Sequence, residues 1–252
     1  MDQSPRWPLW LPVAAIGCGA SFGFLVLGVI SGIAHSTKGP GITAAGTVVV
    51  DVSVVVASVL LAGTVRPPRP AQFGLRGASL KFAAQMAALG ALAFFLFSVL
   101  YNVTVRPHNP QRVVEDLGAD TSKILLVLGA LVVIAIAPFC EELFFRGLLF
   151  TVLRQRMPLW PAAVIDGVLF GFVHGSLVIV PVLAALGVMF CYVYERTGSI
   201  FPTIALHALN NTIAYGDRTD WGVALVVGAA MVLACGYGLV RAPRRDPAPV
   251  TG

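Results

Sequence analysis

The chain has 252 residues, of which 57% are hydrophobic and only 12% are charged, and its mean hydropathy is +0.85. Soluble domains carry roughly 25% charged residues, so this composition excludes an ordinary cytosolic enzyme and a disordered chain. The formal net charge of +5 is modest and forms no basic stripe on an expected soluble module, which argues against a nucleic-acid partner. We therefore expect an integral membrane protein.

A helix that crosses the hydrocarbon core of a bilayer needs about 20 apolar residues. Apolar segments of about this length follow one another along the chain, at 8–34, 42–65, 80–105, 122–140, 159–175, 176–195, 199–215 and 221–241. The sequence thus predicts an all-α fold, a polytopic bundle of about eight transmembrane helices. We expect residues 1–240 to form a single transmembrane domain and the basic tail 241–252 to be disordered.

The loops between these segments indicate an orientation. With the amino terminus in the cytoplasm, eleven Lys and Arg residues lie on the cytoplasmic side and five on the opposite side. Loops rich in Lys and Arg face the cytoplasm. We expect both termini to be cytoplasmic, in a multi-pass protein of the cell membrane, here a bacterial plasma membrane. The polar segment 106–121 would then lie outside, with room for a short helix.

Ionisable side chains inside the apolar segments are few, and most of them are concentrated between residues 141 and 174. They are Asp51, Glu141, Glu142, Arg146, Asp166, His174 and His207. A charge inside a membrane is costly and usually serves a function, so these residues are the candidates for a site.

The first cluster is CEELFFRG. Glu142 and Arg146 are four residues apart with the acid first, which favours an ion pair along a helix. Glu141 lies about 100° around the same helix and has no local partner. This spacing assigns Glu142 to structure and Glu141 to chemistry, as a general base or acid.

Two further pairs with helical spacing follow. Phe170 and His174 share one helix face, and so do His207 and Asn211. A histidine and an amide on one face can donate hydrogen bonds to a developing oxyanion, or can simply join two helices. If the helices converge, Glu141 and the imidazoles could activate a water molecule for attack on an amide.

A metal site is the alternative chemistry for these side chains. HExxH is absent, and no ligand set is compelling, so we expect no cofactor. If zinc is bound, its ligands would be Glu141, His174 and His207, as a His₂Glu site.

These motifs resemble those of the CPBP intramembrane proteases, also called the CAAX-protease, Rce1-like or Abi family. That family carries EExxxR, FxxxH and HxxxN/D on membrane helices, which read here as Glu141–Arg146, Phe170–His174 and His207–Asn211. The resemblance covers about 135–215, and the trio in this order is a strong signal.

The resemblance implies a CAAX-type intramembrane endopeptidase. Glu141 and His174 would activate the hydrolytic water, and His207 and Asn211 would form the oxyanion hole. By the same resemblance, Glu142 and Arg146 would shape the site. We expect Phe170, in the second motif, to support it as well. The family is labelled a metalloprotease, although a metal-free glutamate mechanism is argued for members of it. The substrate would be a peptide or protein in or at the membrane, of the prenylated type in eukaryotic relatives.

Other functions are compatible with the same buried charges. The chain could be a non-catalytic membrane scaffold or immunity protein, or a small proton-coupled transporter. Two acids outside the motifs, Asp51 and Asp166, have no assigned partner; Asp166 lies roughly on the side of His174. Counting from the cytoplasmic ends places Glu141 roughly 20 Å deep and His207 about 12 Å, so we expect a kink at Pro138 or Pro202, or a tilt, to bring them together.

Overall fold

The computed structural model describes residues 7–33, 35, 39–105 and 122–243, and within these ranges every long element is a helix and none is a strand. Two helices precede a short 3₁₀ turn, and a third follows it: α1 (Trp10–Ile33), α2 (Pro40–Val65), η1 (Pro70–Phe73) and α3 (Leu80–Val105). One continuous helical rod comes next: α5 (Lys123–Ala130), η2 (Leu131–Ile136), α6 (Ala137–Glu142), η3 (Leu143–Phe150) and α7 (Thr151–Arg154). Four helices complete the fold: α8 (Leu159–Phe172), α9 (Val180–Thr197), α10 (Phe201–Gly216) and α11 (Trp221–Arg241).

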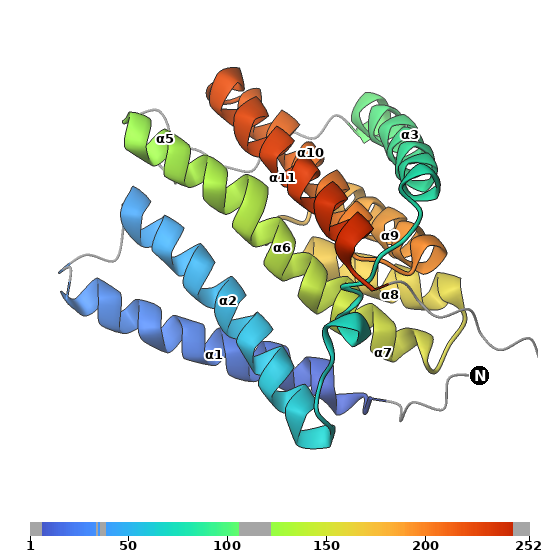
Figure 1. The fold of residues 1–252 in the computed structure, drawn as a ribbon. Helices are drawn as coiled ribbons and strands as arrows, with labels where there is room; N and C mark the ends of the chain where they lie inside the picture. Colours follow the sequence, from blue (N-terminus) through green and yellow to red (C-terminus); the bar gives the residue numbers. More distant parts are fainter. Residues whose placement is uncertain (1–6, 34, 36–38, 106–121, 244–252) are drawn as a thin grey trace, which may run out of the picture.

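The rod at 123–154 passes through the middle of the bundle (Figure 1). Helices α1 and α2 pair on one side of it, while α10 and α11 pair on the other, and α8, α9 and α3 cover the remaining face. The rod contacts α2, α8, α9, α10 and α11. The rod therefore has helices on several sides, and polar side chains on it can be buried within the protein.

Helix boundaries follow the local chemistry of the sequence. The Ser122 hydroxyl accepts a hydrogen bond from Leu125 N at the start of α5, and the Asp220 carboxylate accepts one from Val223 N at the start of α11. Pro202 lies in the first turn of α10, where its missing N–H costs nothing. Helix α9 ends at Gly198, whose φ of 67° is the left-handed conformation of a helix C-terminus.

The transmembrane bundle predicted from hydropathy is confirmed. Six helices in the described part of the chain are long and apolar enough to cross a membrane, namely α1, α2, α3, the rod, α9 and α11. Large apolar side chains project outward from them, as Phe22, Phe24 and Leu25 do on α1. In a bilayer these side chains face lipid, so the protein is a multi-pass membrane protein.

Some expected boundaries were wrong. The fourth span does not end at residue 140 but continues as a helix to Arg154, because FFRGLLFTVL is largely apolar and contains no proline. Helix α8 ends at Phe172, so His174 lies in the turn that follows it. The expected outer helix at 106–121 and the end of the tail, from 244 on, lie outside the described residues.

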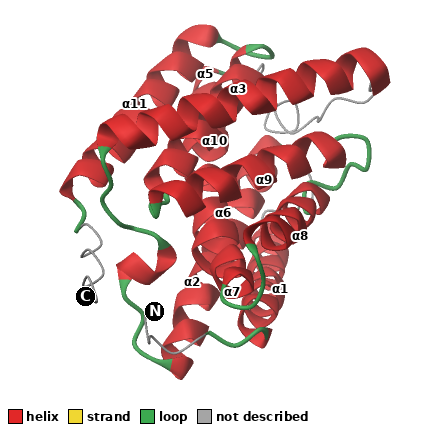
Figure 2. Cartoon of the chain, turned by 90° about the vertical axis from the view of Figure 1, so that its right-hand side faces the viewer, coloured by secondary structure: helices red, strands yellow, loops and turns green. Residues whose placement is uncertain are grey.

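The loops expected on one side of the membrane do lie at one end of the molecule (Figure 2). The N–H of Trp7 donates to Gln155, and the Arg156 guanidinium donates to the Trp7 carbonyl. At the same end the Ser199 hydroxyl donates to the Arg76 carbonyl, and Gly77 N donates to Pro243 O. The grouping of the basic loops is therefore observed, while the side of the membrane on which they lie stays a prediction.

Candidate active site

Glu142 and Arg146 form the ion pair expected from their spacing, and the pair is fully buried. Arg146 Nη1 donates to Glu142 Oε1 at 3.0 Å, and both side chains are 0% exposed. Arg146 Nη2 also donates to Gly187 O on α9, at 3.0 Å. Such a pair is costly to bury, and its hydrogen bonds offset part of that cost. Arg146 thereby links the rod to α9.

Glu142 has a second partner that the sequence alone did not indicate. His207 Nδ1 lies 3.1 Å from the same Oε1 atom of Glu142. An ionised carboxylate only accepts hydrogen bonds, so the Nδ1 atom of His207 carries the proton. The other ring nitrogen of His207 is thereby turned toward the neighbouring residue, Glu141.

The carboxylate of Glu141 faces two imidazoles. Its Oε2 atom lies 4.0 Å from His174 Nε2 and 3.8 Å from His207 Nε2. The same Oε2 is buried and has no hydrogen-bond partner. Glu141 and His174 are each about a fifth exposed, whereas His207 is 3% exposed. Three residues from separate parts of the sequence therefore meet at one partly open point.

His174 is oriented by the last turn of α8, which it follows. Its Nδ1 lies 2.7 Å from the carbonyl oxygen of Phe170, one turn earlier, so Nδ1–H donates and Nε2 is left to face Glu141. Histidines at metal or catalytic centres are commonly oriented in this way, by a hydrogen bond at the nitrogen that does not react.

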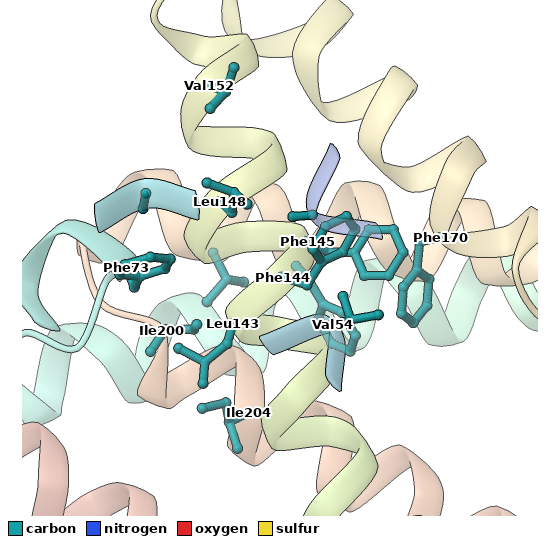
Figure 3. Packing of buried hydrophobic residues seen from close by; sticks show 14 of the residues in the cluster. Val54, Phe73, Leu143, Phe144, Phe145, Leu148, Val152, Phe170, Ile200 and Ile204 are labelled. Atoms are coloured by element: carbon teal, nitrogen blue, oxygen red, sulfur yellow. The ribbon is translucent and has the colours of Figure 1, made fainter. Parts of the chain in front are cut away.

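Aromatic rings enclose the buried guanidinium. Arg146 Cζ lies 4.7 Å from the ring centre of Phe170 and 5.0 Å from that of Phe190, which are distances for cation–π interaction. Figure 3 shows Phe170 beside Phe145 in the buried cluster, and their rings meet edge to face at 5.2 Å. Phe170 also contacts the rings of His174 and His207. Phe170 therefore contacts the guanidinium and both imidazoles of the site. A supporting role is what we expect for it.

Asn211 is the expected site residue whose hydrogen bonds lead away from the others. It lies one turn after His207, but its side-chain N–H donates to Val133 O at 2.8 Å. Its carbonyl oxygen accepts from Asn210 at 3.2 Å. The structure therefore brings together Glu141, Glu142, Arg146, Phe170, His174 and His207. The side chain of Asn211, on α10, is instead hydrogen-bonded to η2.

The difference in depth is resolved without a kink at Pro202. The N–H of Ile200, just before α10, donates a hydrogen bond to Gly74 O at 2.8 Å. A Cβ on Gly147 would lie 2.8 Å from Phe73 O. The segment around Phe73 thus lies level with both Gly147 and the start of α10. Counted along the helices from that level at about 1.5 Å per residue, Glu141 lies about 9 Å deeper than Gly147 and His207 about 10 Å deeper than Ile200. The two side chains therefore reach about the same depth. Helix α10 begins deeper in the protein because the loop before α3 occupies the space beneath it.

Asp166 has a partner that the sequence alone did not indicate. It is fully buried, and its Oδ1 lies 3.6 Å from Arg146 Nε and accepts a hydrogen bond from Cys191 Sγ at 3.1 Å. Its partner is thus the arginine of the first motif. Spacing did place Asp166 on the face of Phe170, but only the contact between α8 and the rod reveals the arginine. Asp51 on α2 interacts electrostatically with Glu141, and its buried Oδ2 has no hydrogen-bond partner.

In this arrangement the candidate zinc ligands lie farther apart than zinc coordination requires. Tetrahedral bonds of about 2.0 Å place donor atoms roughly 3.3 Å apart, which is shorter than the 4.0 and 3.8 Å from Glu141 to the two imidazoles. No three His, Cys, Asp or Glu side chains among the described residues form a metal-binding group.

An apolar groove reaches the residue next to Glu141. It has a volume of about 620 Å³ and runs between α2, the rod, α10 and α11. Its lining includes Phe139 and Cys140 on the rod and Ala234 and Cys235 on α11. Sequence reasoning did not find this groove, because its walls come from helices distant in the chain.

The fold and the site together define a class: a polytopic membrane protein with a carboxylate and two imidazoles converging at one point among its helices. Residues 123–213 match the family described as "Type II CAAX prenyl endopeptidase Rce1-like". This stretch contains all three motifs, so the resemblance expected from them is confirmed, and this segment of the chain is similar to that family.

One relative supports the same family. The chain is 33% identical over 123 residues to "Putative membrane peptidase YdiL" of Bacillus subtilis (strain 168). The match covers 49% of this chain and 46% of the relative, so the chain matches about half the length of that relative. No solved structure matches this chain.

Proposed function

We propose that the protein is an intramembrane endopeptidase that hydrolyses a peptide bond of a membrane-associated substrate. The observation that carries this proposal is the position of Glu141 Oε2, 4.0 Å from His174 Nε2 and 3.8 Å from His207 Nε2. A water molecule between them would lie within hydrogen-bonding distance of all three groups. The match of residues 123–213 to an Rce1-like endopeptidase family supports the same chemistry.

The reaction begins with the transfer of a proton from water to the Glu141 carboxylate. The hydroxide attacks the carbonyl carbon of the peptide, and Glu141 returns the proton to the amine nitrogen as the C–N bond breaks, while His174 Nε2 accepts a hydrogen bond from the attacking water. His207 stabilises the oxyanion. Because its Nδ1–H is held by Glu142, its Nε2 can donate a hydrogen bond only when the ring is an imidazolium.

The groove beside Cys140 supports entry of an apolar substrate from the bilayer. Its lining is almost wholly apolar and its volume of about 620 Å³ is large enough for a lipid chain or apolar side chains of a peptide. We propose a CAAX-type peptide carrying a prenyl group as the substrate class, in agreement with the family description.

The test is cleavage of an internally quenched peptide with a farnesylated CAAX end by the full-length protein in detergent micelles. We expect wild type to cleave it and Glu141→Gln to lower kcat by about 10²–10⁴-fold, the usual contribution of a general base. Glu195→Gln is the matched control, because Glu195 pairs with Arg154 near the surface, away from the site. The same peptide without the farnesyl group tests the substrate class.

Two results would contradict the proposal. A folded wild-type protein that cleaves neither peptide would favour a non-catalytic scaffold, and full activity in Glu141→Gln would remove Glu141 as the base. A chelator is added in a parallel reaction. Loss of cleavage that zinc restores would overturn the metal-free mechanism while leaving the peptidase activity in place.

A further inference from the structure

Another apolar pocket lies beside the groove, nearer to the loop that connects α2 with α3. It has a volume of about 180 Å³, and its lining includes Ser58 and Val59 on α2, Phe73 in the loop and Leu143 on the rod. The Ser58 hydroxyl is already donated to the Val54 carbonyl, at 2.7 Å. The interior of the pocket is therefore apolar and suits a hydrocarbon chain.

Arginines gather around the loop side of this pocket. Arg69 lines the pocket itself and is exposed. The Arg76 guanidinium donates to the carbonyl of Ala71 in η1, the short turn whose residues form part of the lining. Arg66, directly after α2, has a buried Nε–H without a hydrogen-bond partner. Three guanidinium groups thus lie on the short stretch of chain that closes the pocket at one end.

The positive charge of these arginines is not neutralised within the described part of the protein. None of Arg66, Arg69 and Arg76 takes part in an ion pair there. Glu195, an acid at the same end of the molecule, is paired with Arg154 at 2.6 Å. A planar guanidinium binds phosphate through two N–H groups at once, so this surface is complementary to a phosphate group.

The position of the pocket along the membrane fits a lipid. The apolar span of α2 ends at Val65 and that of α3 begins at Leu80, so the loop between them lies where the headgroups of a bilayer begin. Leu143 lies four residues deeper on the rod than Gly147, which packs against Phe73, so the pocket extends about 6 Å inward from the loop. A lipid tail gains little by moving from one apolar environment into another, so selection between lipids must come from the headgroup.

We propose that this pocket binds an anionic phospholipid of the surrounding bilayer. One acyl chain lies between α2, η1 and the rod, and the arginines of the loop, foremost Arg69, bind the headgroup phosphate. Basic pockets between membrane helices bind anionic headgroups in this way. The lipid joins three segments at a point two residues from Glu141 in the chain and stabilises them together. The inference goes beyond the proposed peptidase function and does not depend on it.

The test is the melting temperature of the full-length protein in detergent micelles, titrated with phosphatidylglycerol or with phosphatidylcholine that has the same acyl chains. A ligand that binds the folded state raises the melting temperature with its concentration. We expect phosphatidylglycerol to act at concentrations on the order of tenfold lower than phosphatidylcholine, and inorganic phosphate to have no effect. An equal response to both lipids would overturn the role of the arginines. A response to inorganic phosphate alone would show an anion site without a lipid.

Two variants localise the site. Arg69→Gln should weaken phosphatidylglycerol binding about fivefold, the usual share of one basic side chain near an anionic surface. Val59→Trp should block the acyl chain, because an indole there would fill the pocket. The matched controls are Arg241→Gln, an exposed arginine at the same end of the molecule, and Val56→Trp, on an exposed face of α2; neither residue lines the pocket.

The melting temperature without added lipid shows whether each variant folds. Arg69 is exposed, so Arg69→Gln decides the question even if Val59→Trp does not fold. The proposal is wrong if Arg69→Gln and Arg241→Gln weaken binding equally, since a general attraction of charge would then explain it. It is also wrong if an excess of the farnesylated peptide displaces phosphatidylglycerol, measured by mass spectrometry of the intact complex, because the pocket would then receive the substrate.

Discussion

At the residue scale, the two nitrogens of His207 have separate roles. Nδ1 is held by Glu142 at 3.1 Å, and Nε2 faces Glu141 at 3.8 Å. The ring itself packs between Phe170 and Phe190, with ring centres 5.6 and 5.2 Å away. The aromatic contacts thus set the position of the His207 ring, and the hydrogen bond to Glu142 sets its orientation. A substitution can remove the nitrogens and keep the aromatic packing.

The substitution His207→Phe separates the packing of the ring from the contacts of its nitrogens. A phenyl ring retains the packing against Phe170 and Phe190 but has no nitrogen to donate to an oxyanion. We expect kcat for the farnesylated peptide to fall by about 10²–10³-fold, as when an oxyanion donor is removed elsewhere, while the protein still folds. His35→Gln, at an exposed loop position, is the control and should keep full activity. Activity of His207→Phe within a few-fold of wild type would show that His207 is only a packing residue.

At the element scale, the widened turns of the rod provide acceptors for side chains. In η2 the carbonyl of Val133 accepts from Asn211, and in η3 the carbonyl of Arg146 accepts from the Thr151 hydroxyl at 3.0 Å. A π-helical turn loosens the regular ladder of backbone hydrogen bonds, and such turns are frequent at functional sites. The two widened turns lie on either side of Glu141 and Glu142 in the rod. Their carbonyl groups accept hydrogen bonds from side chains of α10 and α7.

Much of the site was predictable at this scale, because helical spacing is local. The four-residue spacing indicated the pair of Glu142 with Arg146 and left Glu141 without a partner on its own helix, and the buried Oε2 of Glu141 has no hydrogen-bond partner. The contact of Asp166 with Arg146 was not predictable, since it depends on how closely α8 approaches the rod and α9. The depth of His207 in the bundle was equally unpredictable from the sequence, because it depends on the loop before α3, which contacts the start of α10.

The approach of α8 to α9 depends on glycine. A Cβ on Gly167 would lie 2.5 Å from Ala184 O, and one on Gly187 would lie 2.6 Å from the Cα of Gly167. Gly187 O also accepts from Arg146. These two glycines therefore bring a backbone acceptor within reach of the buried guanidinium.

Gly167→Val should force the two helices apart. We expect a loss of about 1–3 kcal/mol in the free energy of unfolding, the usual cost of overpacking, together with a lower kcat because Gly187 O moves away from Arg146. The measurement is the melting temperature in detergent, with peptide cleavage in parallel. Gly28→Val on α1 is the control, since no atom lies within 4 Å of a Cβ there. Equal melting temperatures for both variants would contradict the importance of this contact.

At the scale of the whole molecule, the apolar groove joins parts of the chain that are far apart in sequence. Val48, Val52 and Val55 come from α2, and Met231, Ala234 and Cys235 come from α11, on opposite sides of the rod. Only the rod, α8, α9 and most of α10 fall inside the Rce1-like segment at 123–213. The residues that would perform the chemistry therefore lie in the segment shared with the family, while much of the groove wall lies outside it. This division predicts that changes in the groove affect substrate binding more than the chemical step.

Ala234→Trp tests that division. An indole at position 234 would fill part of the groove between α2 and α11 without touching Glu141, so we expect KM for the farnesylated peptide to rise about tenfold or more while kcat changes little. Leu233→Trp, one residue away on the lipid-facing side of α11, is 74% exposed and does not line the groove. Its KM should equal that of wild type. If both variants behave alike, or if Ala234→Trp lowers kcat alone, the substrate does not enter by this groove, and access must be sought on the side where His174 is exposed.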